Sequence, residues 1–162
     1  MWEIYAQVIG FGSTYIGFFV PLIISIFLFI NVDKKLYFSK ENLLLLAISV
    51  PLTLYFSFTR ESYIGDNFYY SGHAICFYAI IYFFLKSKQK HNKQILFINT
   101  FFTLYLADIF IVLQSHNFES FSHSGIGGAG IVDSLIITPF AVVICSYIMT
   151  YLHRNMLGIK TI

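Results

Sequence analysis

Long apolar runs alternate with short polar stretches along the whole chain. Five runs carry little or no charge, and they cover residues 4–30, 43–58, 73–85, 95–113 and 131–152. A helix needs about 20 apolar residues to cross a bilayer. The first run, of 27 residues, is long enough, whereas the second, of 16, needs residues from its flanking turns. The pattern predicts an all-α membrane protein, a polytopic bundle of about five transmembrane helices.

The basic residues fall almost entirely on one side of this predicted bundle. Five spans place successive connections on alternating sides, and Arg60 is then the only Lys or Arg on its side. The other nine share the opposite side: Lys34, Lys35, Lys40, Lys86, Lys88, Lys90, Lys93, Arg154 and Lys160. Cytoplasmic loops carry the excess of Lys and Arg. We therefore expect the N-terminus and the connections 59–72 and 114–130 to lie outside, and the C-terminus to be cytoplasmic.

The composition agrees with a membrane location. Hydrophobic residues make up 57% of the chain and charged residues 11%, whereas soluble domains carry about 25% charged residues. We expect residues 1–162 to form a single domain integral to a membrane such as the bacterial inner (plasma) membrane, and we expect no nucleic-acid partner. Cys76 and Cys145 both lie in apolar runs, which is typical of small core residues. A homo-oligomer is compatible with so short a chain.

The stretch from Gly65 to Ala74 interrupts this apolar sequence with polar, flexible and titratable residues. It contains Gly65-Asp66 and, after a short spacing, Ser71-Gly72-His73. Arg60 lies nearby, and an arginine can hold a phosphate with two parallel hydrogen bonds. A second connection on the same predicted side holds His116, Glu119, His123 and a glycine-rich run. The two connections together predict an outward-facing polar site.

Gly65-Asp66 followed by Ser71-Gly72-His73 resembles the second signature of the type 2 phosphatidic acid phosphatase superfamily, and is most similar to its sphingomyelin synthase branch. In that superfamily a third signature follows one helical hairpin later: a histidine, three further residues, and an aspartate that opens a span. Asp133 opens the fifth predicted span and matches that aspartate. The resemblance covers residues 60–86 and 128–140, about a quarter of the chain.

The resemblance implies a phosphohistidine mechanism on a phospholipid or lipid phosphate, without a metal or other cofactor. The histidine of the third signature would attack phosphorus while Asp133 orients its imidazole. His73 would protonate the departing alkoxide as general acid.

The same resemblance implies where the phosphoryl oxygens bind. Ser71 and the backbone at Gly72 would hold them, and Arg60 would stabilise their charge. Asp66 would lie in the surroundings of the site. Independently of the resemblance, we expect Asp108 to lie near the site as well. Asp108 is in the fourth apolar run near its outer end, where it could pair with Arg60, orient a histidine or bond to a neighbouring helix.

The sequence departs from the family pattern at the nucleophile. Four positions before Asp133 stands Ala129, where the family has its histidine. Three explanations stay open: an inactivating change at Ala129, a natural relative without catalysis, or a substitute nucleophile, His123 or His116.

Other readings compete with the phosphotransfer hypothesis. The residue types from Gly125 to Gly130 match the dinucleotide-binding motif, but this run lies between two apolar runs and not in a βαβ unit. Ser124 with His73 fits an intramembrane serine protease poorly. The alternative from another class is a non-enzymatic membrane protein, such as an immunity or exclusion factor, that binds another membrane protein through its helices.

Overall fold

The computed structural model describes residues 15–64, 67–86, 92–114 and 134–156. Six helices and two strands lie within these residues. They are α2 (Tyr15–Asn31), α3 (Lys34–Tyr37), α4 (Lys40–Tyr55), β1 (Phe58–Ile64), β2 (Asn67–His73), α5 (Phe77–Lys86), α6 (Lys93–Gln114) and α7 (Ser134–Met156).

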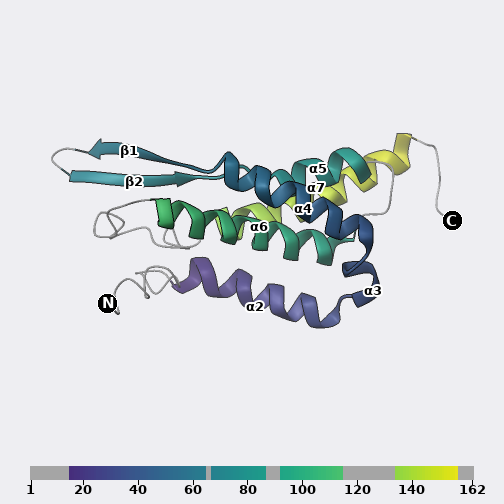
Figure 1. Cartoon of the computed structure of the whole chain (residues 1–162). Coiled ribbons are helices and arrows are strands. Elements are labelled where there is room, and N and C mark those ends of the chain that lie inside the picture. Colours follow the sequence, from purple (N-terminus) through teal and green to yellow (C-terminus); the bar gives the residue numbers. More distant parts are fainter. Residues whose placement is uncertain (1–14, 65–66, 87–91, 115–133, 157–162) are drawn as a thin grey trace.

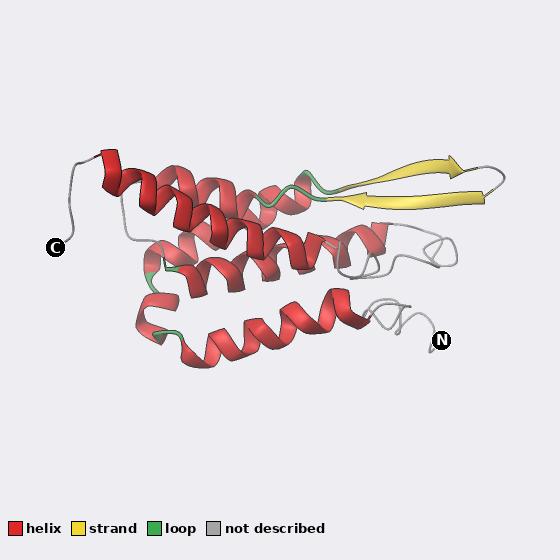
Figure 2. Cartoon of the chain, turned by 180° about the vertical axis from the view of Figure 1, so that it is seen from behind, coloured by secondary structure: helices red, strands yellow, loops and turns green. Residues whose placement is uncertain are grey.

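The long helices lie side by side in a bundle, and the two strands extend past one of its ends (Figures 1 and 2). The short helix α3 lies at the opposite end, together with the start of α6 and the end of α7 (Figure 1). Successive connections therefore alternate between the ends, as the apolar pattern predicted. Lys34, Lys35 and Lys40 belong to the α3 end, and Arg60, in β1, belongs to the hairpin end.

Five of the helices coincide with the five apolar runs, with shifted ends. The described part of the first run is α2, which ends at Asn31, and α4 covers Lys40–Tyr55 where the second run was expected to reach residue 58. Ser39 caps α4 by accepting a hydrogen bond from the Asn42 backbone amide, so the helix begins before its apolar residues do. The other runs correspond to α5, α6 and α7.

The segment from residue 58 to residue 73 corrects one expectation. Residues 59–72 were expected to be the connection between two spans, and the next span was expected to begin at His73; the structure has an antiparallel hairpin there, and α5 begins only at Phe77. Aromatic residues, which favour strands, occur in both β1 and β2, and β1 adds the β-branched Thr59 and Ile64. The strands are separated by Gly65-Asp66 alone, a dipeptide typical of tight hairpins.

Helix α6 occupies the centre of the bundle. It contacts α2, α4, α5 and α7, and Leu96, Phe101 and Leu104 are almost completely buried. The Phe101 ring stacks on that of Tyr105, with centroids 6.0 Å apart, and Phe18 of α2 packs against both rings.

Two of the described helices are long and apolar enough to cross a membrane, over Lys93–Ile111 in α6 and Ser134–Leu152 in α7. They differ in burial: 61% of the α6 segment is buried inside the bundle, but only 17% of the α7 segment. Helix α5, with 10 residues, rises only about 15 Å, half of a bilayer's hydrocarbon core. The five predicted spans are thus present as helices, and two of them have the length of a span.

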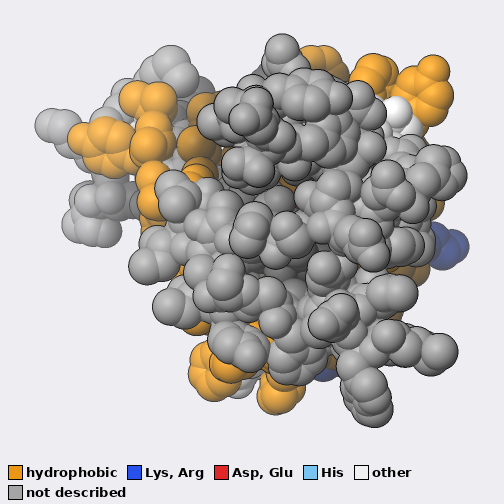
Figure 3. Space-filling view, turned by 90° about the vertical axis from the view of Figure 1, so that its left-hand side faces the viewer, with side chains coloured by type: hydrophobic (Ala, Val, Ile, Leu, Met, Phe, Trp, Pro, Cys, Tyr) orange, Lys and Arg blue, Asp and Glu red, His pale blue; other side chains and the backbone are white. Residues whose placement is uncertain are grey.

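Helix α4 buries three uncharged polar side chains and exposes several apolar ones. Its buried residues are Asn42, Leu45, Ser49 and Thr53, while Leu43, Leu44 and Ile48 are exposed. Figure 3 views the hairpin end, and the described side chains around its rim are mainly hydrophobic. A helix on the surface of a water-soluble protein shows the opposite pattern.

Candidate functional site

The hairpin brings three of the predicted site residues to neighbouring positions. In its register Arg60 stands directly opposite Ser71, and Phe58 stands opposite His73. Directly opposed residues of an antiparallel pair have Cβ atoms about 4.5–5.5 Å apart. Alternate residues of a strand share a face, so the positions of Arg60, Ser71 and His73 belong to one face of the hairpin. Gly72, opposite Thr59, belongs to the other face.

These positions lie near the base of the hairpin, where it joins the bundle. Strand β1 contacts α6. The residues that flank the hairpin are held by Thr53 of α4: its hydroxyl accepts a hydrogen bond from the Phe77 backbone amide (3.2 Å), and its carbonyl accepts one from the Ser57 hydroxyl (2.6 Å). Thr53 is completely buried. One buried residue thus contacts both the segment that leaves α4 and the start of α5.

The other half of the predicted site falls outside the described residues. Asp66, His116, His123, Ala129 and Asp133 all belong to the undescribed ranges. Asp133 is the residue directly before α7, and α7 starts at the hairpin end of the bundle (Figure 1). The approach of Asp133, Ala129 or His123 to His73 therefore stays a prediction.

Asp108 lies on α6, in the half of that helix nearer the hairpin. Its side chain is half-buried and has an interaction partner. Its predicted pairing with Arg60 stays a prediction. Within the described ranges, no group of three His, Cys, Asp or Glu residues could hold a metal ion.

A second polar cluster, which the sequence reasoning missed, lies inside the bundle. Asn42, Tyr78 and Asn99 come from α4, α5 and α6, and their side chains bond to one another. The Asn42 Oδ1 atom accepts from the Tyr78 hydroxyl and from Asn99 Nδ2, both at 3.0 Å. Asn99 Nδ2 also donates to the Tyr78 Oη atom at 2.8 Å. We call these three residues the buried triad.

The buried triad is tied to the α3 end and keeps one unused acceptor. Asn42 Nδ2 donates to the Tyr37 carbonyl at 2.7 Å. Asn99 is completely buried, and among the described residues its Oδ1 atom has no hydrogen-bond partner. The sequence signal for the triad was Asn99 itself, a polar residue in the middle of an apolar run, since such residues bond across helices.

No protein-family model, curated protein or solved structure matches the chain. The resemblance to the phosphatidic acid phosphatase superfamily therefore rests on its motif residues alone, and function has to be argued from the site.

The two polar regions suit different chemistry. The buried triad satisfies most of its own hydrogen-bonding groups between three helices, which suits helix association. The hairpin places a guanidinium-bearing, a hydroxyl-bearing and an imidazole-bearing residue on one face at the end of the bundle. Such a set can bind an anion and deliver a proton to it.

Proposed function

We propose that the chain is an integral membrane protein that binds a lipid phosphate at its hairpin end. In this proposal it acts there as a lipid phosphatase or a phospholipid head-group phosphotransferase. The observation that carries the proposal is the hairpin register, in which Arg60 opposes Ser71 and His73 follows two positions later.

The surface of the bundle supports the membrane location. A central helix such as α6 would be apolar in a soluble protein as well, but α7 is apolar and mostly outside the core. Ile144, Ile148 and Leu152 of α7 are exposed. Helix α4 exposes Leu43 and Leu44 while it buries the hydroxyl of Ser49. Exposing this much apolar surface to water is unfavourable by about 25 cal/mol per Å², so a hydrocarbon surrounding fits these helices better.

The proposed reaction follows from the residue types. A histidine from the connection before α7 attacks phosphorus, and the bond from phosphorus to the leaving oxygen breaks. His73 gives its proton to that oxygen, while Arg60 and Ser71 hold the other phosphoryl oxygens. Water or an alcohol then takes the phosphoryl group from the histidine. His123 and His116 are the candidates for the nucleophile, because position 129 is alanine.

The test is an assay of the full chain reconstituted in vesicles with phosphatidic acid or with a fluorescent phospholipid. Release of inorganic phosphate or exchange of the head group is measured for the wild type, for His73→Ala and for Ala129→His. We expect His73→Ala to abolish turnover and Ala129→His to raise it. Lys93→Ala, at the opposite end of the bundle, is the control. An inactive wild type together with an inactive Ala129→His variant would contradict the proposal.

A non-enzymatic role is the second candidate, and the exposed face of α7 favours it. That face presents Ile144, Tyr147, Ile148 and Tyr151, on which a helix of another membrane protein could pack. Site-directed crosslinking from Ile148 in native membranes tests this role. A single crosslinked protein partner, combined with no lipid turnover, would favour it over the enzyme.

A further inference from the structure

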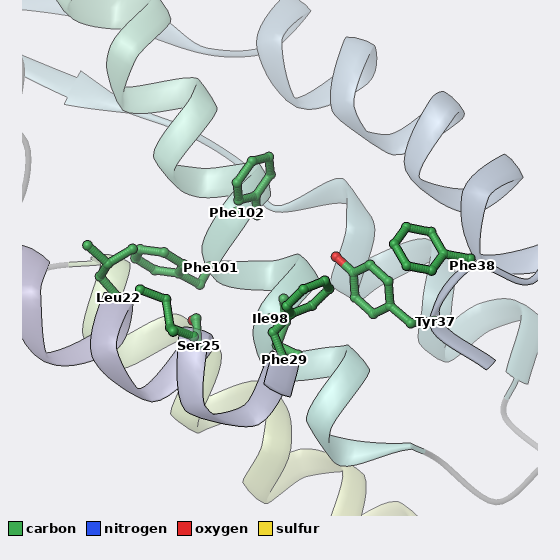
Figure 4. A pocket seen from close by; sticks show the side chains of 9 residues that line it. Leu22, Ser25, Phe29, Tyr37, Phe38, Ile98, Phe101 and Phe102 are labelled. Atoms are coloured by element: carbon green, nitrogen blue, oxygen red, sulfur yellow. The ribbon is translucent and has the colours of Figure 1, made fainter. Parts of the chain in front are cut away.

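Helices α2 and α6 and the residues at the end of α3 line an open cavity of about 350 Å³ (Figure 4). It is lined by Leu22, Ser25, Ile26, Phe29, Tyr37, Phe38, Ile98, Phe101 and Phe102. We call it the α2–α6 cavity. It lies on a different part of the bundle from the hairpin, toward the end that carries α3.

The lining of the α2–α6 cavity is almost entirely apolar, so the cavity favours an apolar ligand. Of the described residues, Ser25 and Tyr37 alone bring hydroxyl groups to it. Ser25 is 6% exposed, and its Oγ atom has no hydrogen-bond partner within the described part of the chain. The volume lies within the range of about 300–1,000 Å³ that holds small ligands, and is roughly twice that of a dry apolar cavity that accepts benzene. A hydrocarbon chain matches this lining.

A positive charge stands beside one of the lining residues. The Lys34 ammonium lies 3.7 Å from the centroid of the Phe29 ring and donates a hydrogen bond to the Phe29 carbonyl. Lys35 and Lys40 follow in the same segment, whose acidic residues are Asp33 and Glu41. Asp33 is engaged as the cap of α3, accepting from the Lys35 backbone amide at 2.9 Å. Exposed lysines therefore lie next to the apolar cavity.

We propose that the α2–α6 cavity holds an acyl chain of an anionic phospholipid, whose phosphate lies at Lys34. The lipid comes from the leaflet at the α3 end, opposite to the hairpin. The cavity accepts the chain, and Lys34 selects a head group with net negative charge. This inference rests on the membrane location proposed above but not on the phosphotransfer reaction.

The test is native mass spectrometry of the full chain, extracted in detergent and exchanged into either phosphatidylglycerol or phosphatidylcholine with identical acyl chains. The wild type should retain phosphatidylglycerol preferentially. Ile26→Trp should fill the cavity and lose most of the bound lipid. Its matched control is Ile144→Trp on α7, because the two isoleucines are similarly exposed, at 52% and 57%, and only Ile26 lines the cavity.

A second pair of variants tests the head-group contact. Lys34→Gln should lower the preference for phosphatidylglycerol over phosphatidylcholine by about fivefold, the effect of roughly one surface charge on an anionic lipid. Lys93→Gln is the control, since Lys93 lies at the same end of the bundle but over the Tyr147 ring of α7, at 3.1 Å. The wild-type fold of each variant is checked by its thermal unfolding in detergent.

Three results would overturn the inference. Equal lipid retention by Ile26→Trp and Ile144→Trp would remove the cavity as the site. An unchanged head-group preference in Lys34→Gln would remove the contact. A dimer that Ile26→Trp converts to a monomer, without change in bound lipid, would assign the cavity to a second copy of the chain. Extraction of the protein by alkaline carbonate would instead contradict the membrane location. A chain that binds lipid as expected but shows no turnover would contradict the phosphotransfer reaction and leave the lipid site standing.

Discussion

The hairpin end and the buried triad are both polar regions of an apolar molecule, and they differ in what surrounds them. Arg60, Ser71 and His73 lie on a two-stranded ribbon that extends beyond the helices (Figure 1). Asn42, Tyr78 and Asn99 lie between three helices and bond to one another. The first set can meet a ligand at the end of the bundle, whereas the second connects helices. Polar residues in such a chain therefore have to be sorted by position in the fold before chemistry is assigned to them.

The two regions also differ in what stabilises them. An isolated two-stranded hairpin is only marginally stable in water, and this one is anchored through β1 on α6 and through Thr53 at its base. The triad is enclosed by packed helices, where an unmade hydrogen bond is costly. Substitutions should consequently change activity at the hairpin and stability at the triad.

The largest expected effect is at Arg60. Arg60→Ala should lower turnover of a lipid phosphate by about 10²–10³-fold, the usual loss when a group that stabilises developing charge is removed. The turnover of Arg60→Lys should lie between those of the wild type and Arg60→Ala, because lysine keeps the charge but cannot form the two parallel hydrogen bonds of arginine. Steady-state kinetics in vesicles measure both. Full activity in both variants would show that the arginine does not contact the phosphate.

The next effect is at the triad. Asn99→Ala removes two hydrogen bonds from the cluster and should lower the free energy of unfolding by about 1–2 kcal/mol. Thermal unfolding in detergent micelles measures the change. Asn31→Ala is the control, since Asn31 is exposed and donates only to the Phe27 carbonyl of its own helix.

A double-mutant cycle sharpens this result. Tyr78→Phe removes only the hydroxyl of the triad, and its effect should be less than additive with Asn99→Ala because the two groups share a network. Strict additivity would mean that the triad does not act as a unit.

Thr53→Val tests the hydrogen bond between α4 and the start of α5, beside the base of the hairpin. Valine keeps the shape of threonine but removes one of two acceptors for the Phe77 amide, which also donates to the Ile75 carbonyl at 2.9 Å, so the cost should be at most about 1 kcal/mol. Because the lost bond ties the start of α5 to α4, hydrogen exchange at the first turn of α5 should increase more than exchange in α7. Thr53→Ser keeps the hydroxyl and should restore protection.

The smallest expected effect is at the cap of α4. Ser39→Ala should destabilise the protein by about 0.5–1 kcal/mol, because the Asn42 amide loses its cap acceptor. Ser39→Asp, which can also cap, should stay near the wild type. A loss as large as that of Asn99→Ala would indicate that the cap positions the triad through Asn42.

The helices could be predicted because their signal is local. Runs of apolar residues placed α2, α4, α5, α6 and α7, and the alternation of their connections placed the lysines at one end. The hairpin was not predicted, because Gly65-Asp66 was assigned to a catalytic signature. Between two aromatic-rich stretches the same dipeptide is also typical of a hairpin turn.

Of the candidate site, the sequence indicated Arg60, Ser71 and His73 but not their pairing. Opposition of Arg60 and Ser71 follows from strand register, which depends on where the turn falls. Asn99 stands out in its apolar run, but its partners could not be predicted, since the triad joins positions 42, 78 and 99 and only the packing of three helices decides that they meet.

The two cysteines of the folded chain lie in different surroundings. Cys76 is buried and Cys145 is exposed, and both are free thiols. In the proposed membrane Cys145, midway along α7, faces hydrocarbon, where a thiol stays protonated and reacts slowly with a maleimide. A maleimide should therefore label the native chain slowly and add two labels to each chain unfolded in denaturant, so that the doubly labelled share measures the unfolded fraction without an activity assay.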